Sequence, residues 1–448
     1  MTLHFRILYH CYRFASRRWH WAQRRFTRPG LAVLGAFVLV ASLAPDTDNN
    51  LTYQALPLLL VLLVAAVCLS RLFKVTFTAS RVLPRFGTAG CPLNYRVVVK
   101  NLSRHGQSGL SLLENLAAPW PPFQEWLGVQ RAEQKVLRSF RFSGRRSLNP
   151  FKVALAKDAL VPTMAAGQEV EVQVELTPLR RGILRLTGVT LARPDPFGLF
   201  RALSTVLLPQ TVLILPKRYL LSAVALPGAA RYQEGGVALA AHVGQSEEYV
   251  ALRDYRHGDP MRHIHWRSWA RVGKPVVKEF EDEFFVRHAL VLDTFMEDAH
   301  SEVFEEAVSV AASFVCTLPT QESLLDLLFV GPQSYCFTAG RGVAHVEQML
   351  EILASVRACS DQPFLALEHL VLRHVGVVSG CVCVLVAWDE QRRDFVRKLK
   401  ALGIPVLILI IVPPGQGREL EPGPLGDEPD RFFVLEAGQM ETGLAKLK

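Results

Sequence analysis

Two long apolar stretches near the amino terminus stand out in the hydropathy pattern. Residues 29–45 form a run of 17 uncharged positions, and residues 49–70 form a run of 22. As helices they would reach about 25 Å and about 33 Å, against about 30 Å for the hydrocarbon core of a bilayer. Because only a few residues around Asp46 and Asp48 separate them, the pattern predicts two transmembrane helices that form a hairpin over residues 29–70.

Between residues 75 and 216 the apolar positions recur with a period of two, which is typical of β-strands. Residues 168–176 alternate almost perfectly, and further strand-like runs lie at 75–82, 95–99, 184–191 and 211–215. Short strands without a long helical pattern predict an immunoglobulin-like β-sandwich over 75–216, and the strand 168–176 implies a sheet that is wet on one side. Residues 116–160 fit either a hairpin insertion or a loop.

The segment Arg193–Phe200 reads RPDPFGLF. Two prolines fix φ and remove hydrogen-bond donors, and Gly198 permits a positive φ. The segment therefore predicts a rigid corner with Phe197 and Phe200 as packing anchors. A recognition loop for a partner is the alternative.

Strands and helices alternate beyond residue 286. Apolar strands are expected at 288–293, 324–330, 381–387 and 405–412, and helices at 302–316, 344–357, 363–374 and 390–402. This alternation predicts a doubly wound α/β domain with a parallel sheet over 286–448. Ligands of such sheets sit at the carboxyl ends of the strands, which is where Asp293 and Asp389 fall.

A dense charged block at 247–285 lies between the two domains. In it Asp259 suits a helix N-cap, Gly273 suits the position after the last turn, and residues 260–272 are expected to be helical, with a strand over 276–280. Met261, Ile264, Ser268 and Val272 would share one helix face, whereas Arg262, Trp266 and Trp269 would project from another.

The charges of this block nearly cancel, with seven Lys or Arg against eight Asp or Glu over 247–283. The balance favours internal ion pairs, and a partner-docking surface is the alternative because Trp and Arg anchor interfaces. A catalytic cluster of His257, His263, His265 and Asp259 is disfavoured, since residues two apart on a helix, as His263 and His265 are, point away from each other.

Composition and charge refine this division. The 448 residues are long enough for two or three folded units, half are apolar, and 20% are charged, which excludes a disordered chain. A mean hydropathy of +0.20 leans toward a membrane protein. The net charge is +9, and residues 1–30 contribute seven arginines and no acid, so the rest sums to about +2 by subtraction. The positive-inside rule then predicts that both termini lie in the cytoplasm, with residues 1–28 as a basic cytoplasmic segment.

Two other interpretations of the amino terminus remain open. A cleaved signal peptide would use Ser42-Leu43-Ala44 as its cleavage site, although the basic leader is long for that. A nucleic-acid arm would use the arginines with Tyr12, Trp19 and Trp21. A basic aromatic segment beside an apolar span more often lies against anionic lipid headgroups, so membrane lipid is the expected partner and nucleic acid is not.

The eight cysteines show no CxxC spacing and no dense framework, which favours a reducing compartment. Cys381 and Cys383 alternate with valines and are expected to be small core residues of a strand.

The charged block resembles the signature of the family called domain of unknown function 58. The resemblance also covers the segment 179–200 and the apolar hairpin. It implies a bacterial inner-membrane protein with a β-sandwich joined to a von Willebrand factor A-like domain. It also implies a MoxR-type AAA+ ATPase as partner and, in some bacteria, a transglutaminase-like membrane protein. The signature positions matched are Arg253, Tyr255, Gly258, Asp259, Arg262, Ile264, Trp266, Ala270, Arg271, Lys278, Phe280 and Glu283.

A von Willebrand A-like domain also raises the question of a Mg²⁺ site. Such sites use Asp-x-Ser-x-Ser, because a hard divalent ion prefers carboxylate and hydroxyl oxygens. This chain has Asp293-Thr-Phe-Met-Glu297, in which Phe295 cannot ligate. The candidate ligands are Asp293, Glu297, Thr338 and Asp389. The simpler alternative is that Asp293 caps a loop or the next helix.

These observations together predict a non-enzymatic, membrane-anchored adaptor for a MoxR-type ATPase in a chaperone-like or envelope-stress system. The alternative is a metal-dependent hydrolase that uses Asp293, Glu297 and Asp389. No nucleophile–base pair can be identified in the sequence, and this disfavours the alternative.

Overall fold

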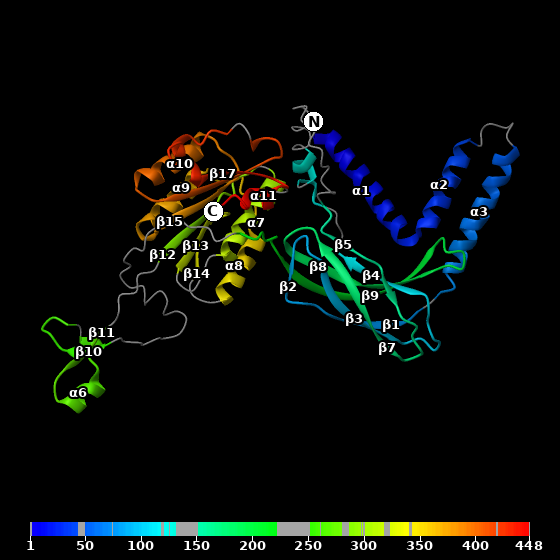
Figure 1. The fold of residues 1–448 in the computed structure, drawn as a ribbon. Coiled ribbons are helices and arrows are strands. Elements are labelled where there is room, and N and C mark those ends of the chain that lie inside the picture. Colours follow the sequence, from blue (N-terminus) through cyan, green and yellow to red (C-terminus); the bar gives the residue numbers. More distant parts are fainter. Residues whose placement is uncertain are drawn as a thin grey trace. The chain divides into compact units, whose positions relative to one another are not determined.

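A computed structural model describes residues 2–43, 50–73, 75–117, 121–124, 126–130, 151–221, 251–259, 261–279, 286–296, 298, 301–317, 323–339, 343–417 and 420–447. The chain divides into two compact units, Met1–Lys217 and Arg218–Lys448, and each is described by itself (Figure 1).

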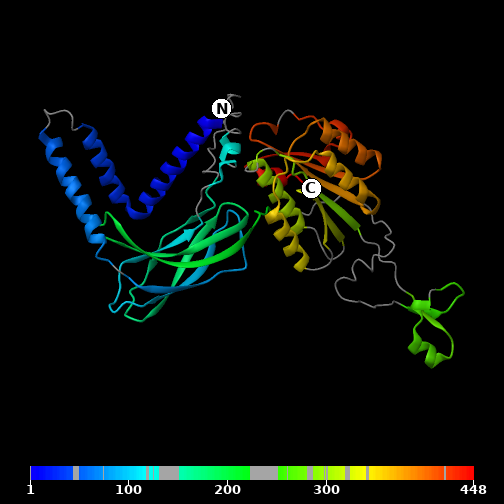
Figure 2. The same ribbon diagram turned by 180° about the vertical axis from the view of Figure 1, so that it is seen from behind.

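Three helices open the first unit: α1 (Thr2–Arg25), α2 (Arg28–Leu43) and α3 (Asn50–Ser70). α2 and α3 cover the two apolar stretches and pack side by side, while α1 diverges from them in both views (Figures 1 and 2). When only the described residues are counted, no helix is both long and apolar enough to cross a bilayer. The helical hairpin lies where it was predicted, and its passage through a membrane stays a prediction.

Two β-sheets form the rest of the first unit. One has the order β1-β3-β7-β5, with β1 (Phe77–Val82), β3 (Leu93–Asn101), β7 (Glu169–Pro178) and β5 (Ala154–Ala156). The other has the order β2-β9-β8-β4-β6, with β2 (Phe86–Thr88), β9 (Arg201–Leu215), β8 (Gly182–Pro194), β4 (Leu110–Leu116) and β6 (Ala159–Val161).

The two sheets share one apolar core. Val97 and Val174 of the first sheet are buried in the same cluster as Leu112 and Ile214 of the second. β7 buries alternate residues and exposes the residues between them, so the predicted sheet with one wet face is confirmed. Of the uncertain segment 116–160, residues 118–120, 125 and 131–150 lie outside the described residues. In its described part β5 pairs with β7, and β6 pairs with β4.

The turn that joins β8 to β9 also holds the helices against the β-sheets. The Asp195 carboxylate accepts hydrogen bonds from the amides of Phe197, Leu199 and Phe200, at 2.9, 2.7 and 2.6 Å. Phe200 is buried with Ala66 of α3, so it is a packing anchor as predicted. Phe197 is 51% exposed, so its predicted role as an anchor is wrong, because its side chain lies on the outer side of the turn.

The same turn contacts the junction between α1 and α2. The rings of Phe26 and Phe200 meet edge to face, 5.0 Å apart between centroids. The Thr27 amide donates to the Leu199 carbonyl at 3.1 Å, and the Thr27 hydroxyl donates to the Gly198 carbonyl. The corner is therefore structural, and it connects the helices to the β-sheets.

The second unit contains a six-stranded sheet of order β14-β13-β12-β15-β16-β17. Its strands are β12 (Val286–Leu292), β13 (Ser323–Val330), β14 (Ser334–Ala339), β15 (Gly380–Leu385), β16 (Val406–Val412) and β17 (Phe432–Glu436). Every pairing is parallel except that of β13 with β14. The predicted doubly wound parallel sheet is confirmed, with an antiparallel edge strand that was not predicted.

Helices cover both faces of this sheet. α9 (Leu365–His374) and α10 (Glu390–Ala401) pack on one face, where Cys381 and Cys383 are buried as predicted. α7 (Glu302–Thr317) packs on β12, β15 and β16 and also contacts α8 (Val343–Ser355), and the short α11 (Met440–Leu444) contacts β17. Short 3₁₀ turns lie at Val375–Val377, Gly423–Leu425 and Pro429–Arg431.

A small separate sheet carries the charged block. β10 (Ala251–Asp254) pairs antiparallel with β11 (Val276–Glu279). Between them lie a 3₁₀ turn, η1 (Met261–His263), and the helix α6 (Trp266–Val272).

Candidate functional site

The described part of the charged block, residues 251–259 and 261–279, is organised around one ion pair. Arg253 at the end of β10 donates two hydrogen bonds to the Asp259 carboxylate, at 2.7 and 2.8 Å, and the Arg256 amide donates a third at 2.8 Å. Bidentate pairing of this kind fixes geometry as well as charge. Gly258, with φ of 108°, permits the turn that brings Asp259 back toward Arg253. The prediction of internal ion pairs is confirmed at this pair.

The carboxylate of Asp259 is strongly stabilised in its charged form. The hydrogen bonds from Arg253 and the Arg256 amide lower the pKa of Asp259 to about 2. The predicted role of Asp259 as a helix N-cap is wrong, because its oxygens are already occupied by these donors.

α6 begins six residues after the predicted start of the helix. Its N-cap is His265, whose ring nitrogen accepts from the Ser268 amide at 3.3 Å. Gly273 ends the helix at φ 73° and donates to the Trp269 carbonyl at 2.9 Å, as predicted. The His265 amide also donates to the Val276 carbonyl at 2.9 Å, which ties the helix to β11.

The block exposes apolar and aromatic side chains among its charged ones. Trp266 stacks on Trp269 with centroids 5.3 Å apart and an interplanar angle of 17°. Trp266 is 63% exposed, Met261 73% and Val272 61%. Met261, Ile264 and Val272 were predicted to share one face of a single helix, but that segment is divided into η1 and α6. Ile264 is buried, whereas Met261 and Val272 are exposed.

The remaining signature positions are spread over the same hairpin. Tyr255 follows β10 and its amide donates to the Pro275 carbonyl at 3.0 Å. Arg262 lies in η1, Ala270 and Arg271 are exposed on α6, and Lys278 lies on β11. Phe280 and Glu283 lie outside the described residues. Ten of the twelve positions therefore fall in one hairpin and its connecting helix.

The second candidate site lies where β12 and β15 end side by side. The strand order changes direction between these two parallel strands, and such switch points are the usual ligand sites of doubly wound sheets. Asp293 follows β12 directly and is fully buried. Its carboxylate accepts from Arg392 Nε at 2.6 Å, and Arg392 Nη1 donates to Asp389 at 2.6 Å. The guanidinium carbon lies 4.8 Å from the centroid of the Phe364 ring.

Asp293 also fixes the loop that follows β12. Its carboxylate accepts from the amides of Phe295 at 3.0 Å and Val386 at 3.3 Å, so the alternative in which Asp293 caps a loop is confirmed. Burial raises the pKa of the Asp293 carboxyl, and Arg392 and the two amides oppose that rise. Burial also lowers the pKa of Arg392, but Asp293 and Asp389 outweigh it, so this pKa is raised above its ordinary value.

The predicted metal ligands are not brought together. Thr338 donates to Asp326 at 2.6 Å, and Asp326 forms a buried ion pair with Arg287 at 2.6 Å. In the sheet register Thr338 pairs with Asp326, which pairs with Ala289 of β12. Asp293 lies four residues after Ala289, just past the end of β12, or about 13 Å away at about 3.3 Å per residue. Thr338 therefore does not belong to the same site as Asp293.

The remaining predicted ligands do not complete a metal site. Glu297 lies outside the described residues, and Asp389 caps α10 while it pairs with Arg392. Within the ranges that the structure describes, no cluster of three or more His, Cys, Asp or Glu could hold a metal ion. The donor set at Asp293 does not fit a divalent ion, because the guanidinium of Arg392 lies between the two carboxylates.

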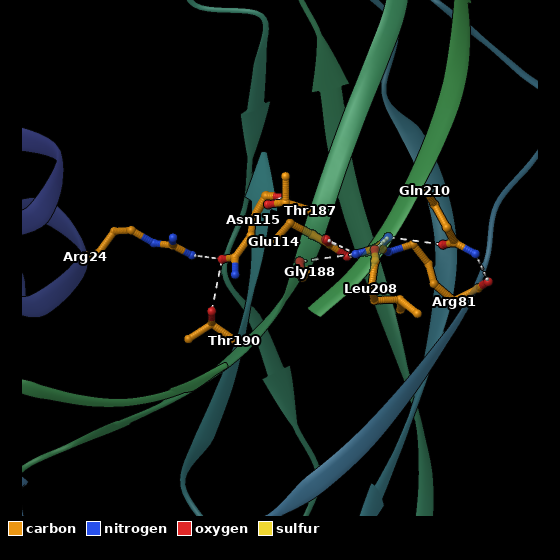
Figure 3. A network of polar contacts seen from close by, with 9 residues as sticks. All are labelled: Arg24, Arg81, Glu114, Asn115, Thr187, Gly188, Thr190, Leu208 and Gln210. Atoms are coloured by element: carbon orange, nitrogen blue, oxygen red, sulfur yellow. Dashed lines mark hydrogen bonds and ion pairs between the residues drawn. The ribbon is translucent and has the colours of Figure 1, made fainter. Parts of the chain in front are cut away.

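A third polar network lies inside the β-sheet unit (Figure 3). Arg81 and Glu114 pair at 2.7 Å with no exposed side-chain surface, and Arg81 also donates to Gln210 at 3.1 Å. Arg24 of α1 donates to Asn115, next to Glu114, and Asn115 accepts from Thr190 at 3.0 Å. Figure 3 shows Arg24 reaching from its helix to the β-strands that carry this network. The network holds α1 against the β-sheets. Its side chains are hydrogen-bonded to one another, and we assign it a structural role.

Sequence reasoning missed Arg392, Arg287 and Arg81. Two signals were available. Asp389 and Arg392 are three apart directly after a buried strand, a spacing that places both near the first turn of a helix. Arg81 occupies an inward position in the alternation of β1. The buried partners Glu114, Asp326 and Asp293 lie 33 to 99 residues from their arginines, so these pairings could not be found from the sequence.

Comparison with known proteins bears on the second unit. Residues 251–421 match the family model described as "Protein of unknown function DUF58". The "Uncharacterized protein YeaD" of Bacillus subtilis (strain 168) is 28% identical over 191 residues, which cover 42% of this chain and 46% of that relative. The match thus spans about half the length of the curated relative.

Solved structures show only distant likeness. Salmonella alpha-2-macroglobulin reacted with methylamine is 13% identical, with a TM-score of 0.19, over 39% of this chain and 9% of that protein. The ASH / PapD-like domain of human CEP192 is 10% identical, with a TM-score of 0.17, over 32% of this chain and 85% of that domain. Neither likeness bears on the function. Over residues 251–421, which include the charged block and most of the α/β sheet, the chain matches the DUF58 family of unknown function, as the signature residues predicted.

Proposed function

We propose that this protein is a membrane-attached, non-enzymatic adaptor that presents the charged block to a MoxR-type AAA+ ATPase. The proposal includes the finer fold and location: α2 and α3 cross the bacterial inner membrane, both termini are cytoplasmic, the β-sheet unit is immunoglobulin-like and the α/β unit is von Willebrand A-like. The proposal rests on one observation about the charged block. Its own ion pair and helix caps fix its conformation, and it nevertheless exposes apolar side chains.

Because the block is held in one conformation, it should lose little conformational entropy when a partner binds. The Arg253–Asp259 pair, the His265 cap and the Gly273 cap hold the hairpin and α6 in one arrangement before any partner arrives. A preformed surface loses less conformational freedom on association than a flexible loop does. The exposed Trp266 is of the residue type that most often dominates binding energy at protein interfaces.

The arrangement at the switch point supports a role without catalysis. The hydrolase alternative needs Asp293 and Asp389 to be available to a metal or a water molecule. Both carboxylates are instead engaged by Arg392, and Asp293 is fully buried. A catalytic acid or base must reach its substrate, and a fully buried, doubly paired carboxylate does not.

The helical part of the first unit supports membrane attachment. Apolar residues of α2 and α3 are exposed, among them Val38, Leu58 and Val61, each at least 60% exposed. Exposed apolar surface on adjacent helices is a mark of a membrane or protein contact. The arginines of α1 have no acidic neighbour in their helix, which suits the headgroups of anionic lipid. A transglutaminase-like membrane protein is a further proposed partner.

Affinity capture tests the proposal. The detergent-solubilised full chain is used as bait with and without ATP, and captured proteins are identified by mass spectrometry. We expect a MoxR-type ATPase whose recovery depends on nucleotide and falls for Trp266→Ala. Leu402→Ala is the matched control, since Leu402 is also exposed and apolar but lies outside the block. Absence of any AAA+ ATPase, or equal recovery with both variants, would contradict the proposal.

A further inference from the structure

The positive charge buried at the switch point is the guanidinium of Arg392. Arg392 lies in the first turn of α10, where Asp389 is the N-cap, and only 6% of its side-chain surface is exposed. Its Nε binds Asp293 and its Nη1 binds Asp389, both at 2.6 Å, while Nη2 points to the Phe295 carbonyl at 3.5 Å. One guanidinium therefore spans two carboxylates, one directly after β12 and one at the N-terminus of the helix that follows β15.

We infer that Arg392 takes the place of a divalent cation at the switch point, so that the α/β unit needs no metal and becomes able to bind one when Arg392 is removed. The inference concerns the α/β unit alone and does not rest on the adaptor proposal. Arg392 is a positioning residue in this account: through Asp293 and Asp389 it joins the loop after β12 to the N-terminus of α10.

The oxygens of Asp293 show why a metal has no place beside Arg392. One oxygen accepts from both Arg392 Nε and the Val386 amide, and the other accepts from the Phe295 amide. Mg²⁺ requires near-octahedral oxygen ligands at about 2.0–2.1 Å. The Phe364 ring faces the guanidinium at 4.8 Å and supplies no ligand. Metal could bind only by displacing the arginine from two charge-assisted hydrogen bonds.

Charge shows why removal of Arg392 should open a site. Asp293 and Asp389 together carry two negative charges when ionised, and Arg392 is the cation that pairs with both. Without it, the two carboxylates lose the ion pair that the described residues give them, and Asp293 is fully buried. Unpaired buried carboxylates either take up protons or bind a cation. A small divalent ion supplies the missing charge.

Thermal unfolding of the purified full chain tests this inference, with EDTA, Mg²⁺ and Mn²⁺ compared. The wild-type Tm should not respond to metal. Arg392→Ala should lower the Tm, and Mn²⁺ should restore at least about 3 °C of the loss. Asp293→Asn combined with Arg392→Ala should abolish that metal response. Arg397→Ala is the matched control: Arg397 lies on the same helix in exposed ion pairs, so this variant should match the wild type.

A second variant and a direct measurement keep the test decisive. Arg392→Gln, which keeps a long polar side chain without the charge, is examined in parallel, so the test survives if the alanine variant fails to fold. Binding is read from the loss of the free Mn²⁺ signal in electron paramagnetic resonance. Mn²⁺ binding by the wild type that Asp293→Asn removes would overturn the inference. So would folded Arg392 variants that bind no Mn²⁺.

Discussion

At the scale of single residues, three buried arginines carry much of the specificity of the fold. Arg81, Arg287 and Arg392 each pair with a carboxylate that has little or no exposed surface. Burying such pairs contributes little net stability, because desolvation offsets the attraction, but leaving one partner alone is costly. Each pair therefore favours one register of the elements that it joins.

The pair inside the β-sheet unit gives a first prediction. Arg81→Met should lower the free energy of unfolding by about 3–5 kcal/mol, because Glu114 is left buried and unpaired. Arg81→Met with Glu114→Leu should recover most of that loss. Urea denaturation of the solubilised full chain measures both. Lys157→Ala breaks an exposed pair and should cost less than about 1 kcal/mol. If Lys157→Ala and Arg81→Met lowered the free energy of unfolding equally, burial of the ion pair would not determine the size of the loss.

Asp259 gives a prediction about pH. Its pKa in the folded block is about 2, against an ordinary value of 3.8, because Arg253 and the Arg256 amide favour the carboxylate. A lowered folded-state pKa means that the contribution to stability is complete above about pH 4 and is lost as the pH falls toward 2. Circular dichroism of the stacked Trp266–Trp269 pair should follow this loss.

Two variants serve as the comparison for the pH experiment. Asp259→Asn should weaken the tryptophan signal at neutral pH and remove its dependence between pH 4 and pH 2. Asp254→Asn changes an exposed neighbouring carboxylate and should keep the wild-type profile. A wild-type profile in Asp259→Asn would show that the Arg253 pair does not hold the block together.

At the scale of elements, the turn between β8 and β9 is the joint between the helices and the β-sheets. The Asp195 side chain accepts hydrogen bonds from backbone amides of the turn, among them that of Leu199. The Leu199 carbonyl in turn accepts from the Thr27 amide, next to the start of α2. The contact is so close that a Cβ at Gly30 would come 1.9 Å from the Leu199 carbonyl oxygen. Gly30 is therefore required by the approach of two backbones.

Two glycines of α2 give a matched test of this joint. Gly30→Ala should destabilise the first unit by about 1–3 kcal/mol, because helix and turn must separate to admit the methyl group. At Gly35 a Cβ meets no atom within 4 Å, so Gly35→Ala should be neutral or stabilising by up to about 1 kcal/mol. Thermal unfolding of the full chain distinguishes them. Equal effects of the two substitutions would mean that the turn does not hold α2.

The elements also show how far the sequence could be interpreted. Strands with a strong pattern, such as β7, β12 and β16, were predicted to within a few residues, because alternation or a continuous apolar run depends only on near neighbours. The start of α6 was misplaced, since Asp259 is a good N-cap on local grounds and the competing Arg253 pair outweighs that preference. The local sequence pattern therefore predicts which helices and strands form. Whether Asp259 caps a helix or pairs with Arg253 can be decided only from the folded structure.

The candidate sites were predictable to different degrees. The positions of Asp293 and Asp389 at strand ends followed from the strand pattern, and the structure joins them through Arg392. Thr338 was grouped with them wrongly, because the antiparallel β14 was not expected and its register places Thr338 beside Asp326. The predicted passage of α2 and α3 through the membrane stays a prediction.

At the scale of the whole molecule, the chain combines two units with different roles in the proposed function. The first unit carries the helices and the β-sheets, and the second carries the family match and both candidate sites. In the second unit the carboxylate of Asp293 at the switch point is buried in an ion pair with Arg392. The charged block instead exposes apolar side chains such as Trp266. Under the proposed function we therefore expect the partner to bind at residues 251–279.

Equilibrium binding between the solubilised full chain and a purified MoxR-type ATPase from the same organism tests this central claim most directly. With ATP present, the account predicts saturable binding that Trp266→Ala weakens about 30-fold, as expected for the loss of about 2 kcal/mol at an interface anchor. Leu402→Ala should leave the Kd unchanged. No binding by the wild type, or the same Kd for wild type and Trp266→Ala, would contradict the account.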